Sequence, residues 1–360
     1  MNEKLKINTK NLLQNLKEVI QAVGKGIENP NNVFYFEKFE NESYLCGTNG
    51  EFTIIKKIDY DFPSCSIKAK EFIELIKSIE EDEINIKLEN NCIEIDTDTT
   101  KTVFKCSDKK IIDKFKICEE WFDLPSDFKH KLSIVSKSAS DSNNIQDGLL
   151  RYVYIYENYM ASCNRYLASY AELDGKILYK MFIKKSNCNF LINSNITKYS
   201  VIDDLLEFYD ESGLIYIIHT LLQEEKFPWK ITKSDWSEEW NNIYHTTPYG
   251  IMESTGLHFK FENNKSVLSS LNRASLFSDD NGYIEFAAEG LLANVRGVGK
   301  YGKSINKLNL TQPVKSKIIA KFNAELLKKA ILSDSDVKYS NNMLSFTDSD
   351  NVFHVILSKY

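Results

Sequence analysis

One short sequence pattern occurs three times along the chain. The copies begin at Ile67 (IKAKEFIELIKSIEEDEINIKLENNCIEID), Leu191 (LINSNITKYSVIDDLLEFYDESGLIYIIH) and Ile318 (IIAKFNAELLKKAILSDSDVKYSNNMLSF). We interpret each copy as a strand, an amphipathic helix and further strand. Successive copies start about 125 residues apart, which is the size of one domain. The repeat therefore predicts three similar domains, at residues 1–118, 119–250 and 251–360.

The composition is that of a well-packed folded protein. Of the 360 residues, 42% are hydrophobic and 27% are charged, so each domain can bury a core. No stretch reaches the roughly 20 apolar residues of a membrane-spanning helix, and the start MNEKLKINTK lacks the apolar segment of a secretory signal. We expect a cytoplasmic protein with no membrane association.

The cysteines and histidines form no pattern typical of metal binding or catalysis. The seven cysteines contain no Cys-x-x-Cys pair and mostly lie in apolar, strand-like runs, which favours reduced core thiols over disulfides or zinc ligands. The five histidines are scattered along the chain. We therefore predict no metal, no cofactor and no catalytic residue.

Each predicted domain divides into two strand, helix and strands units. After the strand-like Lys4–Asn8, Thr9 is placed to cap a helix with one apolar stripe. A second unit begins at Ser64, and its helix is expected to bury Phe72, Ile73, Ile76 and Ile79. Further helices are predicted after Pro125 and after Leu257. The fold class is therefore α+β, with six helices of one kind, two in each domain.

Basic side chains gather on or beside these helices, whereas acidic runs such as 80–83 and 203–211 lie elsewhere. If the six helices line one side of a curved assembly, that side suits the phosphate backbone of duplex DNA and reads no base sequence. The net charge of −6 leaves room for such a local basic surface. The alternative for any one lysine is that it merely solubilises a helix face. The DNA-facing residues predicted in this way are Lys10, Lys70, Lys77, Lys198 and Arg273.

One motif points to another class of function. GVGKYGKS at Gly297–Ser304 matches the P-loop pattern G-x-x-x-x-G-K-S, whose backbone N–H groups cradle phosphates. That chemistry requires a helix directly after the loop. The residues that follow, INKLNLTQPVKSK, show no helical stripe and include Pro313. We expect a basic, glycine-rich hairpin here, and a P-loop nucleotide-binding protein remains an alternative.

Short segments in all three predicted domains resemble one known family. They are KAKEF at Lys68–Phe72, ASCNRYLAS at Ala161–Ser169, RASLFSDD at Arg273–Asp280 and FNAELLKKAI at Phe322–Ile331. In order and spacing they resemble the bacterial DNA sliding clamp, which is the beta subunit of the replicative DNA polymerase III, or a phage-encoded relative. The resemblance implies the DNA clamp fold.

The resemblance also implies a function. The chain would form a head-to-tail homodimer whose ring encircles duplex DNA without sequence specificity and acts as a processivity factor. DNA polymerase and a clamp loader would dock through short peptide motifs. Such a tether is not an enzyme, because it needs no convergent acids, bases or metal ligands. A clamp-like protein that binds polymerase or host factors without encircling DNA is a second alternative.

The resemblance assigns residues to three surfaces. Lys25 and Lys70 match basic residues that face DNA, and Gln146 matches a polar residue of the pore. Leu276 and Phe277 match the ring-closing contact, where they would face Phe104 of the partner subunit. The positions that match the partner-peptide pocket are Leu150, Ser162, Asn164, Tyr166, Leu167, Pro228, Ile356 and Leu357.

Two segments of this pocket differ from the family's pattern. Cys163–Tyr166 reads Cys-Asn-Arg-Tyr where the family has Asp-Gly-His-Arg, and ILSKY at Ile356–Tyr360 replaces Met-Pro-Met-Arg-Leu. We therefore expect the pocket to prefer different client peptides.

Overall fold

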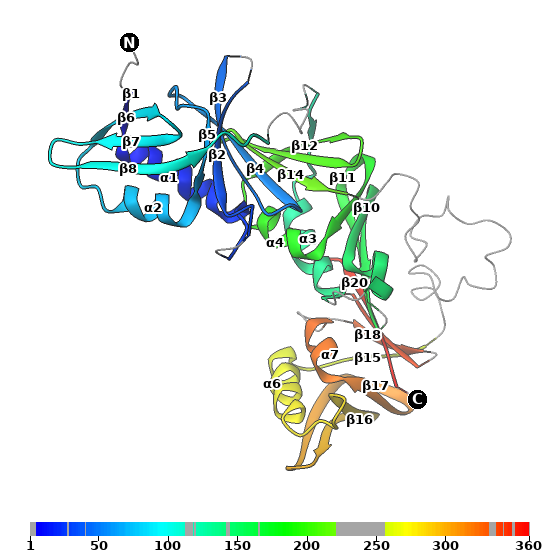
Figure 1. Ribbon diagram of the computed structural model, residues 1–360. Coiled ribbons are helices and arrows are strands. Elements are labelled where there is room, and N and C mark those ends of the chain that lie inside the picture. The colour runs from blue at the N-terminus through cyan, green and yellow to red at the C-terminus, as the bar shows by residue number, and fades with distance from the viewer. Residues whose placement is uncertain are drawn as a thin grey trace. The chain divides into compact units, whose positions relative to one another are not determined.

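The computed structural model describes residues 5–26, 29–39, 41–111, 118, 120–141, 145–164, 166–220, 256–330, 336–340, 342–347 and 350–359. The chain divides into two compact units, Met1–Leu124 with Asn193–Leu222 and Pro125–Ile192 with Gln223–Tyr360. Both units combine antiparallel sheets with short helices (Figure 1), so the predicted α+β class is confirmed. No helix within the described ranges is long and apolar enough to cross a membrane.

The first unit is built on one twelve-stranded sheet. Its order is β1-β6-β7-β8-β5-β2-β3-β4-β14-β13-β12-β9. The strands are β1 (Leu5–Asn8), β2 (Val33–Phe39), β3 (Glu42–Thr48), β4 (Phe52–Ile58), β5 (Cys65–Lys68), β6 (Glu83–Glu89), β7 (Cys92–Asp96), β8 (Lys101–Ser107), β9 (Phe122–Asp123), β12 (Ile196–Ile202), β13 (Leu205–Asp210) and β14 (Leu214–His219).

Two helices of this unit, α1 (Thr9–Val19) and α2 (Ala69–Lys77), pack through apolar stripes. Phe72, Ile73 and Ile76 are buried as predicted, whereas α2 ends at Lys77 and Ile79 beyond it is half-buried. The predicted cap at Thr9 is wrong by one residue. The side chain of Asn8 accepts the N–H of Asn11 at 3.0 Å, whereas the Thr9 hydroxyl donates to the carbonyl of Glu81. Asn8 is the cap because it keeps the extended backbone of β1 at the point where the helix begins.

The second unit contains a six-stranded sheet, β10-β11-β20-β19-β18-β15, and the pair β16-β17. Its helices are α3 (Phe128–Val135), α4 (Lys185–Ile192), α6 (Asn264–Ser275) and α7 (Ala324–Ala330). The strands are β10 (Tyr152–Cys163), β11 (Leu167–Lys184), β15 (Leu257–Lys260), β16 (Tyr283–Gly299), β17 (Gly302–Asn323), β18 (Asp336–Ser340), β19 (Met343–Thr347) and β20 (Val352–Leu357).

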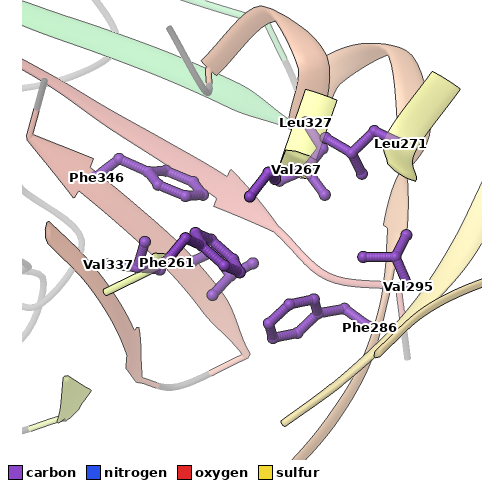
Figure 2. A pocket seen from close by; sticks show the side chains of 9 residues that line it. Phe261, Val267, Leu271, Phe286, Val295, Leu327, Val337 and Phe346 are labelled. Carbon is purple, nitrogen blue, oxygen red and sulfur yellow. The ribbon is translucent and has the colours of Figure 1, made fainter. Parts of the chain in front are cut away.

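Helices α6 and α7 cover a tightly filled apolar core. Side chains from both helices meet aromatic residues of the surrounding strands (Figure 2), and Phe286 stacks on Phe259 at 5.8 Å. The cavity between them measures about 10 Å³, which is room for one water at most. This hollow is therefore core packing and not a ligand site. Its lining residues are Phe261, Val267, Leu271, Phe286, Val295, Leu327, Val337, Leu344 and Phe346.

The repeat copy that begins at Leu191 does not have the predicted order of elements. Helix α4 ends at Ile192, and three strands, β12 to β14, follow it. The helix of this copy therefore lies before Leu191 and not after it. Ile196–Ile202 (ITKYSVI) is rich in β-branched and aromatic residues, which favour strands. Lys198 consequently lies on strand β12 and not on a helix.

Strands that are far apart in sequence join the repeats to one another. Strand β4 pairs with β14, with Lys56 opposite Leu214, and β11 pairs with β20, with Leu167 opposite Ile356. The predicted second domain thus contributes strands to both compact units. The boundaries at 118 and 250 stay a prediction.

Candidate functional site

Two exposed apolar side chains lie side by side where β11 begins and β20 ends. One step beyond the Leu167 and Ile356 pair, the backbone N–H of Leu357 donates to the carbonyl of Tyr166 at 2.9 Å. Tyr166 is 51% exposed and Leu357 is 43% exposed. The end of this ladder therefore presents an apolar pair to solvent, which we call the anchor pair.

Asn164 fixes the turn that carries Tyr166. Its side-chain oxygen accepts the N–H of Tyr166 at 2.9 Å and that of Leu167 at 2.8 Å. Its own N–H donates to the carbonyl of Leu167 at 2.8 Å. An asparagine that binds backbone two and three residues ahead makes a self-contained turn. Tyr166 is thus held in place by its own loop.

The residues of the predicted pocket differ in how accessible they are. Leu150 and Asn164 are partly exposed. Ser162, Leu167 and Ile356 are buried, and the hydroxyl of Ser162 donates to the carbonyl of Val135. Buried residues of this kind shape a surface without touching a ligand. Pro228 lies outside the described residues.

A buried polar contact lies behind the ladder. The Oγ of Ser169 on β11 lies 2.7 Å from Nδ1 of His354 on β20, and it also bonds the hydroxyl of Ser138. All three side chains are buried. A serine and histidine pair sealed from solvent has no route to a substrate, so we assign it a structural role in holding β11 against β20.

Several predicted DNA-facing side chains of the first unit are exposed. Lys10 lies on α1, Lys70 and Lys77 lie on α2, Lys198 lies on β12, and Lys25 lies in the loop before β2. Each can reach a phosphate without losing a core contact.

Two of these lysines have a carboxylate neighbour. Lys10 Nζ lies 2.8 Å from Asp82 Oδ1, and this hydrogen bond raises the pKa of Lys10. Lys77 Nζ lies 2.6 Å from Glu74 Oε1. Ion pairs that are this exposed contribute little to stability and can exchange a carboxylate for a phosphate.

The two predicted DNA-facing residues of the second unit differ from these. Arg273 is exposed on α6 and donates to Asn306 Oδ1 at 2.7 Å and to Ser269 Oγ at 2.8 Å, so its guanidinium is held by neutral partners. Gln146 lies in a 3-10 segment, Ile145–Arg151, and its side chain is outside the described residues.

Two strand segments have an edge that is largely unpaired within the described part of the chain. Strand β8 pairs with β7 from Lys101 to Lys105 and meets β5 only at Cys106 and Ser107. Gly302–Asn309 of β17 pairs with β16 on one side. On the other side, Leu310 forms a single bridge to Phe261. Unpaired edges of this kind accept another strand.

Apolar side chains lie on or near these two edges. Leu276, at the end of α6, is 75% exposed, Val103 on β8 is 60% exposed, and Ile305 on β17 is 56% exposed. Phe104 is partly buried and packs against Phe72, with 5.8 Å between the centres of the two rings. Phe277 is also partly buried. Leu276 is therefore the most accessible of the predicted ring-closing residues.

The P-loop-like motif is the turn of a β-hairpin. Strand β16 ends at Gly299 and β17 begins at Gly302, and these two glycines face one another. Gly302 has a φ of 151°, a conformation that favours glycine. A strand follows the motif, so no helix N-terminus faces it. The prediction of a glycine-rich hairpin is confirmed, and the P-loop alternative is not supported.

Three carboxylates of the described residues are buried, those of Glu37, Glu207 and Asp210, and the sequence analysis did not predict their burial. Glu37 on β2 accepts the N–H of Ile111 at 2.5 Å, and Glu207 on β13 accepts the N–H of Cys118 at 2.9 Å. The second oxygen of Glu207 has no hydrogen-bond donor among the described residues. Burial raises the pKa of Glu207 to about 7. The burial of Glu207 could have been predicted from the sequence, because this glutamate interrupts an apolar, strand-like run, LLEFY.

Four of the seven cysteines behave as core residues, and the other three are half-buried. Cys46, Cys65, Cys163 and Cys188 are buried, and burial raises the pKa of each thiol. A thiol of this kind is a poor nucleophile and a poor metal ligand. In the described ranges, no three His, Cys, Asp or Glu side chains converge as metal ligands.

A basic run near β17 was also missed. Residues 290–321 contain seven lysines and arginines and no aspartate or glutamate, in a chain with a net charge of −6. Most of these cations are exposed on the β16-β17 pair. This charge asymmetry was readable from the sequence.

This chain is similar to known proteins in its fold and not in its sequence. No protein-family model matches this sequence, and no curated protein matches it. The DNA polymerase III beta chain of Streptococcus pneumoniae superposes with a TM-score of 0.80 at 14% identity, covering 99% of each chain. The beta subunit of Streptococcus pyogenes gives 0.78 at 16% identity and covers 99% of this chain and 100% of its own.

A third structure is the beta sliding clamp of C. crescentus with polyethylene glycol bound to a suggested β-motif tethering region. It gives a TM-score of 0.79 at 11% identity and covers 99% of each chain. At these identities the likeness establishes the fold. The chain therefore has the fold of the bacterial DNA sliding clamp, over its whole length.

Proposed function

We propose that this chain is a sliding clamp that closes as a homodimeric ring around duplex DNA and tethers the replicative polymerase as a processivity factor, without catalysing a reaction. The observation that carries the proposal is the way the chain joins its own repeats. In each repeat the third strand after a helix is β8, β14 or β20. Strand β14 pairs with β4 and β20 pairs with β11, whereas the corresponding edge of β8 is largely unpaired.

The edge that would complete the series belongs to β17. Its segment Gly302–Asn309 precedes α7 in the chain, just as β4 precedes α2. The edge of this segment that faces away from β16 is largely unpaired within the described residues. A third ladder, between β8 of one copy and β17 of another, would be a head-to-tail contact. Each copy has one edge of each kind, so two copies can close a ring. Val103, Ile305 and Leu276 would then lose their exposure to water.

The DNA-facing side is supported by exposed cations. Lys25, Lys70 and Lys198 are exposed, and none of them makes an ion pair with a described residue. Lysines that contact only the phosphate backbone bind DNA without a preference for base sequence. A protein that tethers polymerase to DNA must be in the same compartment as the DNA. The predicted cytoplasmic location is therefore part of this proposal.

The docking of clients is supported by the anchor pair. Tyr166 and Leu357 are exposed apolar residues on a ladder with a buried polar contact behind it. The C. crescentus clamp, which shares the fold, has polyethylene glycol bound at a suggested motif-tethering region. We infer that short apolar peptide motifs of the polymerase and of the clamp loader bind here.

Solution mass tests the ring. We expect sedimentation equilibrium at micromolar concentration to give the mass of a dimer, and Leu276→Asp to give a folded monomer with an unchanged circular dichroism spectrum. Leu291→Asp is the matched control, because Leu291 is 54% exposed on the neighbouring strand β16. A wild-type monomer would overturn ring closure and favour a clamp-like protein that binds partners without encircling DNA.

A further inference from the structure

The residues after β20 connect the anchor pair to the basic run on β17. Strand β20 ends at Leu357, and two residues later the N–H of Lys359 donates to the carbonyl of Lys321 at 2.8 Å. The two lysines face one another in an isolated antiparallel bridge. Leu357 and Lys359 are both exposed. A basic pair therefore follows the apolar pair within two residues of the chain.

Tyr283 links the two pairs. The Nζ of Lys359 lies 4.7 Å from the centre of the Tyr283 ring. Burial raises the pKa of the Tyr283 hydroxyl, and the nearby phenol of Tyr166 and carboxyl of Asp279 raise it further. Tyr166, Tyr283 and Lys359 are thus neighbours on a single surface.

Two carboxylates lie close to these lysines. Glu285 faces Lys321 across the β16-β17 ladder, and Asp279 lines the same cavity as Lys321. Asp279 accepts the backbone N–H groups of Asn281 at 3.0 Å and Tyr283 at 2.8 Å. Glu285 Oε1 lies 3.9 Å from a guanidinium nitrogen of Arg296. Within the described residues, neither Lys321 nor Lys359 has a carboxylate within 4 Å. Asp279, Tyr283, Glu285, Arg296 and Lys321 line an open cavity of about 220 Å³.

We propose that Lys321 and Lys359 form an acid-binding extension of the anchor pair, so that clients with acidic residues beside their apolar motif bind best. This inference rests on the proposed client site at Tyr166 and Leu357. Because the apolar anchor pair and the two lysines are only two residues apart along the chain, one peptide with apolar and acidic side chains can contact both. A nucleic-acid strand would use the lysines but would leave the apolar pair without a partner.

Fluorescence anisotropy with two labelled peptides tests the proposal. Both contain the same apolar core of leucine and phenylalanine residues, flanked at each end by three aspartates in one peptide and by three serines in the other. We expect the aspartate peptide to bind wild-type protein about fivefold more tightly at low salt, since two exposed ion pairs are worth that much. The preference should disappear at high salt, because screening weakens exposed ion pairs.

Variants locate the effect. Lys321→Gln with Lys359→Gln should abolish the preference and leave binding of the serine peptide unchanged. Lys265→Gln with Lys315→Gln, which removes the same charge from two other exposed lysines of this unit, should keep the preference.

Each contrary outcome has its own meaning. Equal binding of the two peptides by wild-type protein overturns the acid-binding extension alone. Failure of both peptides to bind overturns the client site as well. If the peptides bind equally and a labelled oligo-dT binds wild-type protein but not Lys321→Gln with Lys359→Gln, the basic pair is a nucleic-acid surface and the proposal is wrong.

Discussion

Leu167 and Leu357 lie one register step apart on the ladder between β11 and β20 and have opposite environments. Leu167 faces Ile356 and is 1% exposed, whereas Leu357, the next residue along β20, is 43% exposed. Successive residues of a strand point to opposite sides. Of the two leucines, only Leu357 can contact a partner, and only Leu167 belongs to a core.

Leu357→Asp should abolish binding of an apolar client peptide and leave the melting temperature unchanged. A carboxylate at this exposed position introduces a charge into the proposed contact without disturbing packing. Peptide anisotropy and differential scanning calorimetry measure the two effects. Leu291→Asp again serves as control, and equal peptide binding by both variants would remove Leu357 from the client site.

Leu167→Ala should lower the free energy of unfolding by about 2–5 kcal/mol, because it leaves a cavity in a filled core. Urea denaturation measures this loss. Peptide binding by the folded fraction should fall much less than in Leu357→Asp. A variant with full stability and no peptide binding would show instead that Leu167 touches the client directly.

Closure of the ring should also depend on β8. Val103→Asp places a charge on the strand edge that is proposed to pair with β17 of a second copy, and it should give a folded monomer, as Leu276→Asp should. Val103 is 60% exposed, so the fold itself has little to lose. Sedimentation equilibrium decides the question. A dimer in both variants would place the contact elsewhere.

Retention on DNA should depend on topology. After loading by its cognate clamp loader, the protein should remain on circular duplex DNA at high salt and leave linear duplex DNA. Salt would screen the proposed phosphate contacts of Lys25 and Lys70, whereas a closed ring around a circle could not dissociate without opening. Gel filtration of the loaded complexes measures retention, and equal loss from both DNA forms would contradict encirclement.

Glu207 should make stability depend on pH. Its pKa is about 7 in the folded chain against an ordinary 4.5, so the native state holds a proton that the unfolded state releases. The contribution of Glu207 to the free energy of unfolding is fully present below about pH 4.5, and it is lost as the pH rises through about 7. The loss amounts to about 3 kcal/mol at most.

Urea denaturation across this range measures the effect. Glu207→Gln should remove the decline, while Glu211→Gln, on the exposed turn after β13, should keep it. If the free energy of unfolding of the wild-type protein rises between about pH 5 and about pH 7.5, other titrating groups determine the pH dependence of stability.

Local patterns in the sequence determined much of this protein. The repeat and the apolar stripes located α1 and α2, because a helix face is defined by residues three and four apart. The absence of such a stripe after Gly297–Ser304 was enough to predict a hairpin there. The placement of the helix in the copy at Leu191 failed, because ITKYSVI follows strand propensity and not the repeat.

Tertiary structure alone decided which strand edges meet. The ladders from β4 to β14 and from β11 to β20 join segments more than 150 residues apart, and nothing in either segment specifies its partner. The same ladders bury Leu167 and Ile356, expose Tyr166 and Leu357, and bring Lys359 to Lys321. Sequence patterns describe neighbours along the chain, whereas exposure and charge clustering depend on neighbours in space, which only the folded sheet defines.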